Sequence, residues 1–175
     1  MTEHSTRQPD RAYTIRTAFD LDQPVVIDLY ENGRLSGQTP EDDPDSDIRD
    51  INRSYLAEDG GSALWVAESP GTEAELPRIV GMIGVRHTGG HLAEIRRLRV
   101  DPGHRGNGLG SRLMETALAF CRDRGYLKIK LDTRMEREQA IALFQKHGFY
   151  LTRTRDVGGK QHHEFYLDLY RDPEG

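Results

Sequence analysis

The chain of 175 residues carries 24 lysines and arginines against 29 aspartates and glutamates, and 35% of its residues are hydrophobic. The formal net charge of −5 gives no general electrostatic reason to bind nucleic acid, and no apolar run approaches the length needed to cross a bilayer. One cysteine, Cys121, excludes an intrachain disulfide and favours a reducing compartment. We therefore expect a soluble cytoplasmic protein with neither a nucleic-acid nor a membrane partner.

The chain length fits one domain that can bury a substantial core. We expect this domain to span residues 11–170. Residues 1–10 lack the apolar stretch of a signal peptide and are predicted to be disordered, and residues 171–175 are predicted to form a short tail.

One strand pattern, two helical patterns and then three further strand patterns fill the first part of the chain. The predicted elements, in chain order, are a strand over 13–16, helices over 20–31 and 47–56, and strands over 64–68, 79–87 and 91–100. Asp20 is expected to cap the first helix, and its apolar stripe would hold Leu21, Val25 and Leu29. An acidic loop over 37–47 separates the helices, and the three strands form an antiparallel meander.

The apolar period changes after residue 100. Leu109, Leu113, Ala117 and Cys121 recur every four residues, which predicts an amphipathic helix that Gly125 ends. The remaining elements are a strand over 127–131, a helix over 137–147 and a hairpin of strands over 149–156 and 161–169. The order β-α-α-β-β-β-α-β-α-β-β predicts an α/β fold with a mixed sheet and not a doubly wound parallel sheet.

A glycine-rich loop between Val100 and Ser111 joins a strand to a helix. Glycines let backbone amides face one point, and a helix start leaves N–H groups unpaired and carries a partial positive charge. Arg105 adds a cation, and no Ser, Thr or Asp immediately precedes Leu109 to cap the helix, although Asn107 could serve. The pattern predicts a phosphate-binding loop, and the alternative is a plain glycine-rich turn with an exposed arginine.

The residues around this loop discriminate between phosphate ligands. A nucleotide-binding P-loop needs Gly-Lys-Ser/Thr, whereas this chain has Gly110-Ser111-Arg112. A dinucleotide fingerprint lacks its third glycine, because Ser111 stands there. Asp132 does lie about twenty residues further on, as ribose recognition requires. A nicotinamide-dependent oxidoreductase therefore remains a minor alternative, disfavoured by the antiparallel meander before the loop.

The run Arg105-Gly106-Asn107-Gly108-Leu109-Gly110 matches the full signature Arg/Gln-x-x-Gly-x-Gly/Ala, and in this the chain resembles the GCN5-related N-acetyltransferase (GNAT) family. Residues 94–102, 131–133 and 140–149 resemble later segments of the family in the correct order. The resemblance implies the GNAT fold, a mixed and mostly antiparallel sheet flanked by about four helices. It also implies transfer of an acetyl group from acetyl-CoA to a primary amine of a small molecule or protein by direct attack. A non-catalytic acyl-CoA-binding module of the same fold is the alternative.

The resemblance further implies where the cofactor lies. Backbone groups of Leu98, Arg99 and Val100 would pair with the pantetheine arm, and the fourth and fifth strands would splay to admit the thioester. The pyrophosphate would be held by the loop residues Arg105, Gly106, Asn107, Gly108, Leu109, Gly110 and Ser111. The acceptor pocket of the family usually involves the region of residues 31–50. Dimers are frequent in the family, so a homodimer is compatible with the resemblance.

Glu94 is the candidate catalytic residue, because its carboxylate could accept the proton of the amine directly or through water. By the period of two it would share a strand face with Leu92, Leu98 and Val100, unless a bulge intervenes. A salt bridge with Arg96 or Arg97 is an equally good interpretation.

The departing thiolate also needs a proton donor. Many relatives place a tyrosine where this chain has Phe144, which cannot donate a proton. Phe144 is expected in the helix core and is a candidate for contact with the cofactor, while Tyr150 and Tyr166 are possible substitutes as donors. The spacing of the seven histidines matches no zinc site, so no metal is predicted.

Overall fold

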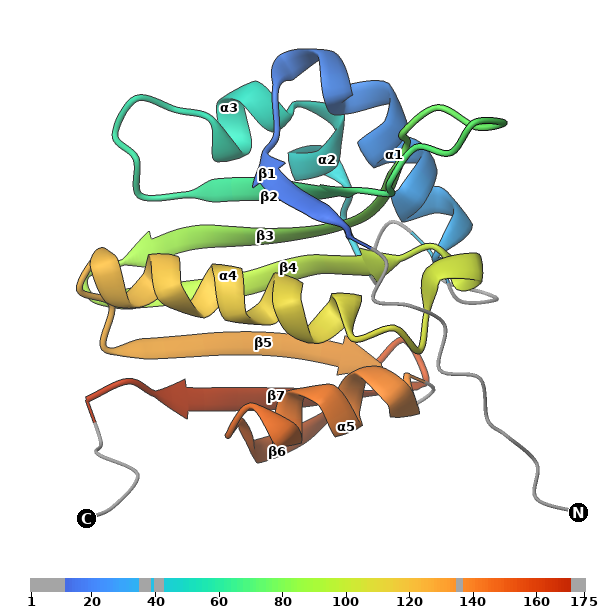
Figure 1. Cartoon of the computed structure of the whole chain (residues 1–175). Helices are drawn as coiled ribbons and strands as arrows, with labels where there is room; N and C mark the ends of the chain where they lie inside the picture. The colour runs from blue at the N-terminus through green and yellow to red at the C-terminus, as the bar shows by residue number, and fades with distance from the viewer. Residues whose placement is uncertain (1–11, 35–38, 40–42, 135–136, 171–175) are drawn as a thin grey trace, which may run out of the picture.

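A single seven-stranded sheet organises the computed structural model, which describes residues 12–34, 39, 43–134 and 137–170 (Figure 1). The strand order is β1-β2-β3-β4-β5-β7-β6, and every neighbouring pair is antiparallel except β4 with β5. The strands are β1 (Thr14–Thr17), β2 (Ala63–Glu68), β3 (Ile79–Gly89), β4 (Leu92–Val100), β5 (Lys128–Arg134), β6 (Tyr150–Val157) and β7 (Lys160–Asp168). The predicted mixed, mostly antiparallel sheet is confirmed. The segments predicted as a disordered start and a tail, 1–10 and 171–175, lie outside the described residues.

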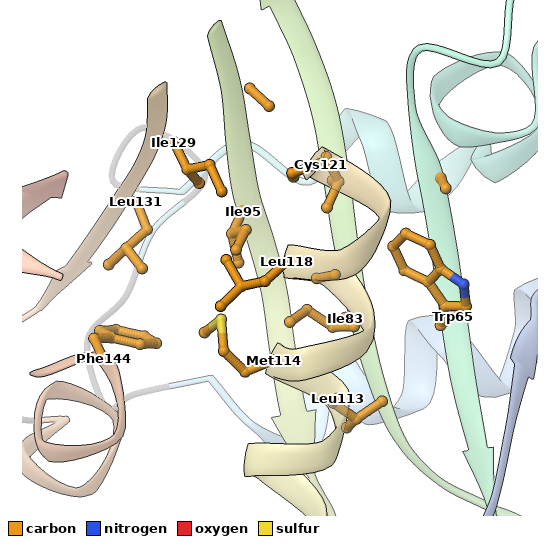
Figure 2. Packing of buried hydrophobic residues seen from close by; sticks show 14 of the residues in the cluster. Trp65, Ile83, Ile95, Leu113, Met114, Leu118, Cys121, Ile129, Leu131 and Phe144 are labelled. Carbon is orange, nitrogen blue, oxygen red and sulfur yellow. The ribbon is translucent and has the colours of Figure 1, made fainter. Parts of the chain in front are cut away.

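Helices cover both faces of the sheet, and each face has its own buried cluster. The helices α1 (Gln23–Asn32), α2 (Ser46–Arg49) and α3 (Ile51–Tyr55) pack on one face. The helices α4 (Leu109–Asp123) and α5 (Glu138–Lys146) pack on the other. Figure 2 shows the larger cluster, in which Leu113, Met114 and Leu118 of α4 lie against the strands. The four-residue repeat predicted from the sequence, Leu109, Leu113, Ala117 and Cys121, is buried on this side of α4.

The first predicted helix differs from expectation at its start. A 3-10 turn, Asp20–Asp22, precedes α1, and the amide of Phe19, the residue before this turn, donates to the Asp22 carboxylate at 2.7 Å. Asp20 is therefore not the cap. The buried positions are Val26, Leu29 and Tyr30, and Leu21 is 89% exposed. The predicted stripe was correct only at Leu29, because a 3-10 turn has three residues per turn and shifts the register of the helix that follows.

The second predicted helix, over 47–56, is broken into α2 and α3. Asp50 leaves the helical region, with φ −145° and ψ 80°, and its side chain accepts the amide of Arg53 at 3.0 Å. Aspartate favours this capping position over a helix interior. Ile48, Ile51 and Tyr55 are nevertheless buried.

Strand β4 contains a bulge at Arg97, whose φ of 60° is the one positive value among the described non-glycine residues. Met82 of β3 pairs with Arg99 and Gly84 pairs with Arg96, so Ile83 faces two residues of β4. A bulge reverses the facing of the residues that follow it. Leu98 and Val100 consequently pack with the cluster beneath α4, as Ile95 does. The prediction that Glu94 shares their face was wrong for these two residues.

Candidate active site

The central feature of the site is a gap in the sheet. Parallel pairing between β4 and β5 is limited to Leu92 with Lys128, Ala93 with Ile129 and Glu94 with Lys130. Beyond Glu94 the two strands separate, and β5 continues to pair with β7 as far as Arg134. The far half of β4 therefore has no strand partner on this side, as the family resemblance implies.

A cavity of about 330 Å³ occupies the gap. Leu98, Leu131 and Phe144, which belong to or pack against the cluster of α4 and α5, line one part of it. Glu94, Arg96, Asp132 and His162, whose side chains alternate with that cluster, line another part. The lining therefore comes from both faces, so the cavity passes through the sheet between β4 and β5. Asp43 and Pro44, from the acidic segment expected near the acceptor pocket, also line it.

The glycine-rich loop lies directly after β4 and presents a row of unpaired amides. Within the described part of the chain, the amides from Gly106 to Ser111 have no protein acceptor, and the first pairing in α4 is Arg112 N–H to Gly108 C=O at 3.1 Å. No side chain caps α4. Unpaired amides at a helix start carry a partial positive charge, which suits an anion.

Backbone conformation explains two of the loop glycines. Gly106 and Gly108 have φ values of 77° and 75°, a region that side chains with a Cβ avoid. A Cβ at either position would meet nothing within 4 Å, so the requirement is conformational and not steric. Both glycines precede the first residue of α4, Leu109.

The side chains of the loop have distinct partners. Asn107 Nδ2 donates to the carbonyl of His104 at 3.3 Å, so Asn107 does not cap α4. Arg105 donates its amide to Pro102 and its Nε to the carbonyl of Val100, at 3.4 and 3.0 Å. Ser111 Oγ lies 2.8 Å from Nε2 of His147, and burial lowers the pKa of that histidine. Sequence reasoning missed this contact, because His147 follows α5 and is distant in the chain.

Glu94 lies at the point where the strands separate, and its side chain is 26% exposed. Its Oε1 is 3.7 Å from Arg96 Nε, which is an ion pair without hydrogen-bond contact. Arg97 instead pairs with Asp43 and Asp47. The carboxylate therefore lines the cavity and has one loosely associated cation, Arg96. This arrangement is compatible with both sequence interpretations, a proton acceptor and a salt-bridge partner.

Arg99 follows the bulge and has an Nε that is enclosed without a hydrogen-bond partner. Burial, together with Arg137 and Arg97, lowers its pKa to about 9. Arg137 donates to the carbonyl of Gly33 at 2.7 Å. The cavity wall formed by these arginines is electropositive.

Neither tyrosine considered as a proton donor reaches the cavity. Tyr150 donates to Asp168 at 2.9 Å, and Lys128 Nζ lies 4.3 Å from the centre of the Tyr166 ring. No tyrosine is among the described residues that line the cavity. Phe144 is 6% exposed, contacts Phe149 and Phe165, and also forms part of the cavity wall.

Sequence reasoning also missed the contact between Asp132 and His162. The sequence pattern suggested Asp132 for ribose recognition and placed His162 among the histidines that match no zinc site, without linking the two residues. The structure places His162 Nδ1 3.1 Å from Asp132 Oδ1, on the cavity wall. Only the pairing of β5 with β7, which connects residues about thirty positions apart, could have revealed it.

Two features are absent from the described ranges of the chain. No group of three or more His, Cys, Asp or Glu side chains there could hold a metal ion. Among the same residues no helix has both the length and the apolar character of a membrane span.

Comparison with known proteins agrees with this geometry. The model of the acetyltransferase (GNAT) family matches residues 10–149. N-acetyltransferase 8 from Homo sapiens is 38% identical over 112 residues, which is 61% of this chain and 46% of the relative. The rat protein of the same name is 38% identical over 109 residues, 61% of this chain and 47% of that relative. The chain thus spans about half the length of these curated relatives.

Solved structures establish the fold. A GNAT acetyltransferase from Staphylococcus aureus has a TM-score of 0.73 at 18% identity, covering 90% of this chain and 99% of that one. Salmonella typhimurium yncA, solved with its cofactor acetyl-CoA, has a TM-score of 0.73 at 21% identity, with coverage of 93% and 96%. Ard1 from Thermoplasma volcanium has a TM-score of 0.72 at 23% identity, covering 91% of this chain and 99% of that one.

Proposed function

Because the chain belongs to the acetyltransferase (GNAT) family, we propose that it is an N-acetyltransferase that moves an acetyl group from acetyl-CoA to a primary amine. The observation that carries this proposal is the row of unpaired amides from Gly106 to Ser111 at the end of β4, next to a cavity through the sheet. The first feature suits a diphosphate and the second suits a thioester arm. Neither would be needed by a protein that only folds.

The residues present fit the parts of acetyl-CoA. The amides of Gly106 to Ser111 and the exposed Arg105 side chain would hold the pyrophosphate. The free edge of β4 at Leu98, Arg99 and Val100 would pair with the pantetheine arm, because β5 has already left this edge. Acetyl-CoA, which is a substrate consumed in each turnover, supplies the activated acetyl group.

The reacting end would lie where the cavity meets Glu94. This carboxylate attracts the incoming ammonium and takes one proton from it, directly or through water, so that the amine becomes nucleophilic. Phe144 contributes an apolar wall, which excludes water from the thioester. The bulge turns Leu98 toward the helices α4 and α5 and leaves the Glu94 side open for the amine.

Thermal stabilisation and thiol release test the proposal together. Acetyl-CoA should raise the unfolding temperature whereas NAD should not, and a panel of amines should contain at least one that accelerates release of the coenzyme A thiol. Stabilisation by acetyl-CoA without release for any amine would instead support a non-catalytic acyl-CoA-binding module. Stabilisation by NAD alone would favour the oxidoreductase alternative.

A further inference from the structure

His162 on β7 has one ring nitrogen in contact with a carboxylate and the other enclosed without a partner. Its side chain is 9% exposed, and Nδ1 lies 3.1 Å from Asp132 Oδ1. Nε2 is buried and has no hydrogen-bond partner. An unpaired buried polar atom is costly unless a ligand satisfies it.

The neighbours of this pair fix its orientation. Asp132 also forms an ion pair with Arg155 of β6, so its carboxylate is held from two strands. Asp132 and His162 both line the cavity that Glu94 lines. A carboxylate that faces Nδ1 favours the tautomer with the proton on Nδ1, and Nε2 then carries a lone pair. Nε2 is therefore a proton acceptor on a ring that belongs to the lining of the cavity.

We propose that His162, oriented by Asp132, is a second proton-transfer residue of the acetyl transfer. This inference rests on the proposed function and assigns a residue to the step for which Phe144 offers no proton. An ammonium loses two protons when it becomes an amide. Glu94 takes the first before attack. Nε2 of His162 takes the second as the nitrogen–carbon bond forms, and returns it to the sulfur as the carbon–sulfur bond breaks.

The proton balance of this assignment closes. The products are the amide, the coenzyme A thiol and one proton that Glu94 releases to solvent, and His162 ends in the form in which it began. Asp132 touches no reacting atom in this scheme, so it is a positioning residue. It places the proton of the neutral ring on Nδ1 and stabilises the imidazolium that forms briefly.

The chain offers a matched control on the next residue. His163 points to the opposite face of β7, where Nδ1 lies 2.9 Å from Thr154 Oγ1 and the ring contacts Phe165. It is not among the residues that line the cavity. His163→Gln therefore repeats the chemical change of His162→Gln on the same strand, outside the site.

Kinetics with the best amine of the panel test the catalytic role. His162→Gln should lower kcat by about 10²-fold or more with the dissociation constant of acetyl-CoA unchanged, because glutamine can still donate to Asp132 but cannot transfer a proton. His163→Gln should match the wild type, and added imidazole should restore turnover to His162→Ala. Equal kcat for His162→Gln and wild type would overturn the inference while leaving the proposed function intact. Parallel loss of acetyl-CoA binding in the variant would also overturn it, in favour of a structural role.

A spectroscopic measurement on the protein without ligands tests the orientation. Nitrogen-15 spectra of histidine-labelled protein should show His162 with its proton on Nδ1, and Asp132→Asn should shift it toward the Nε2–H form and lower kcat with the KM of the amine unchanged. A His162 ring that carries its proton on Nε2 in the wild type would contradict the proposal. Absence of thiol release by the wild type with every amine would remove the proposed function and this inference with it.

Discussion

Arg97 of β4 forms a bidentate ion pair with Asp47 of α2. Its Nη2 lies 2.5 Å from Oδ1 and its Nε lies 3.0 Å from Oδ2. The two side chains are 3% and 1% exposed. Tyr55 also donates to Asp47, and Arg97 reaches Asp43 at 2.7 Å. The ion pair holds Arg97 in the left-handed conformation of the bulge, and the bulge places Leu98 and Val100 on the face opposite Glu94. A contact fifty positions apart in the chain thus shapes the site.

Removal of the Asp47 charge should therefore destabilise the fold. Asp47→Asn leaves a buried guanidinium with an incomplete set of partners, so the free energy of unfolding should fall by about 3–5 kcal/mol. Urea unfolding measures the change. Asp45→Asn is the control, because Asp45 pairs with the exposed Arg49 on the same helix segment and should cost less than about 1 kcal/mol. Equal effects of the two variants would show that the buried pair does not stabilise the bulge.

The loop glycines give a prediction for cofactor affinity. Gly106→Ala or Gly108→Ala must hold a Cβ at positive φ, which costs about 1–2 kcal/mol, so acetyl-CoA should bind about tenfold more weakly. Gly103→Ala in the same segment is the control, because its backbone is not left-handed and the new Cβ would make an ordinary contact with Asp101. Calorimetric titration distinguishes the variants. Unchanged affinity in both Gly106→Ala and Gly108→Ala would contradict the role of the loop.

Glu94→Gln should weaken amine turnover in a pH-dependent way. At neutral pH the variant should lose about 10²-fold in kcat/KM, because a glutamine cannot remove the proton from an ammonium. The defect should shrink as pH rises toward the pKa of the amine itself, about 10.4 for a lysine-like acceptor, since solution then supplies the neutral nucleophile. Acetyl-CoA affinity should stay constant. A defect of the same size at every pH would rule out this role.

Acid should destabilise the protein through Asp22. Its hydrogen bond with Arg16 is the main cause that lowers the pKa of this carboxyl below its ordinary value of 3.8. A lowered folded-state pKa adds stability above the unfolded pKa, and this stability is lost as pH falls through the folded pKa. The free energy of unfolding should therefore decline as pH falls below about 4, and less steeply in Asp22→Asn. Urea unfolding across this pH range measures the slope of the free energy of unfolding against pH for the wild type and for Asp22→Asn. Equal slopes would contradict the prediction.

Much of the fold could be predicted from the sequence because its signals are local. The period of α4 and the glycines of the loop after β4 are encoded within a few turns of chain. The order of strands and helices was correct for the same reason, except that two short helices, α2 and α3, replace the second predicted helix. The break at Asp50 is also local, but capping competes there with a helical pattern that continued on both sides.

The features of the site that escaped prediction depend on distant contacts. Propensity disfavours a left-handed arginine, and only the partners Asp43 and Asp47 make it favourable at Arg97. The Asp132–His162 pair arises from strand register, which a single sequence does not specify without knowing which strands are neighbours. The roles given to Glu94 and to the loop remain predictions that the geometry supports.

A crystal structure with coenzyme A tests the central claim most directly. We predict that the diphosphate lies within hydrogen-bond distance of the amides from Gly106 to Ser111, and that the sulfur lies in the gap between β4 and β5. A diphosphate bound elsewhere, with those amides facing only solvent, would contradict the account.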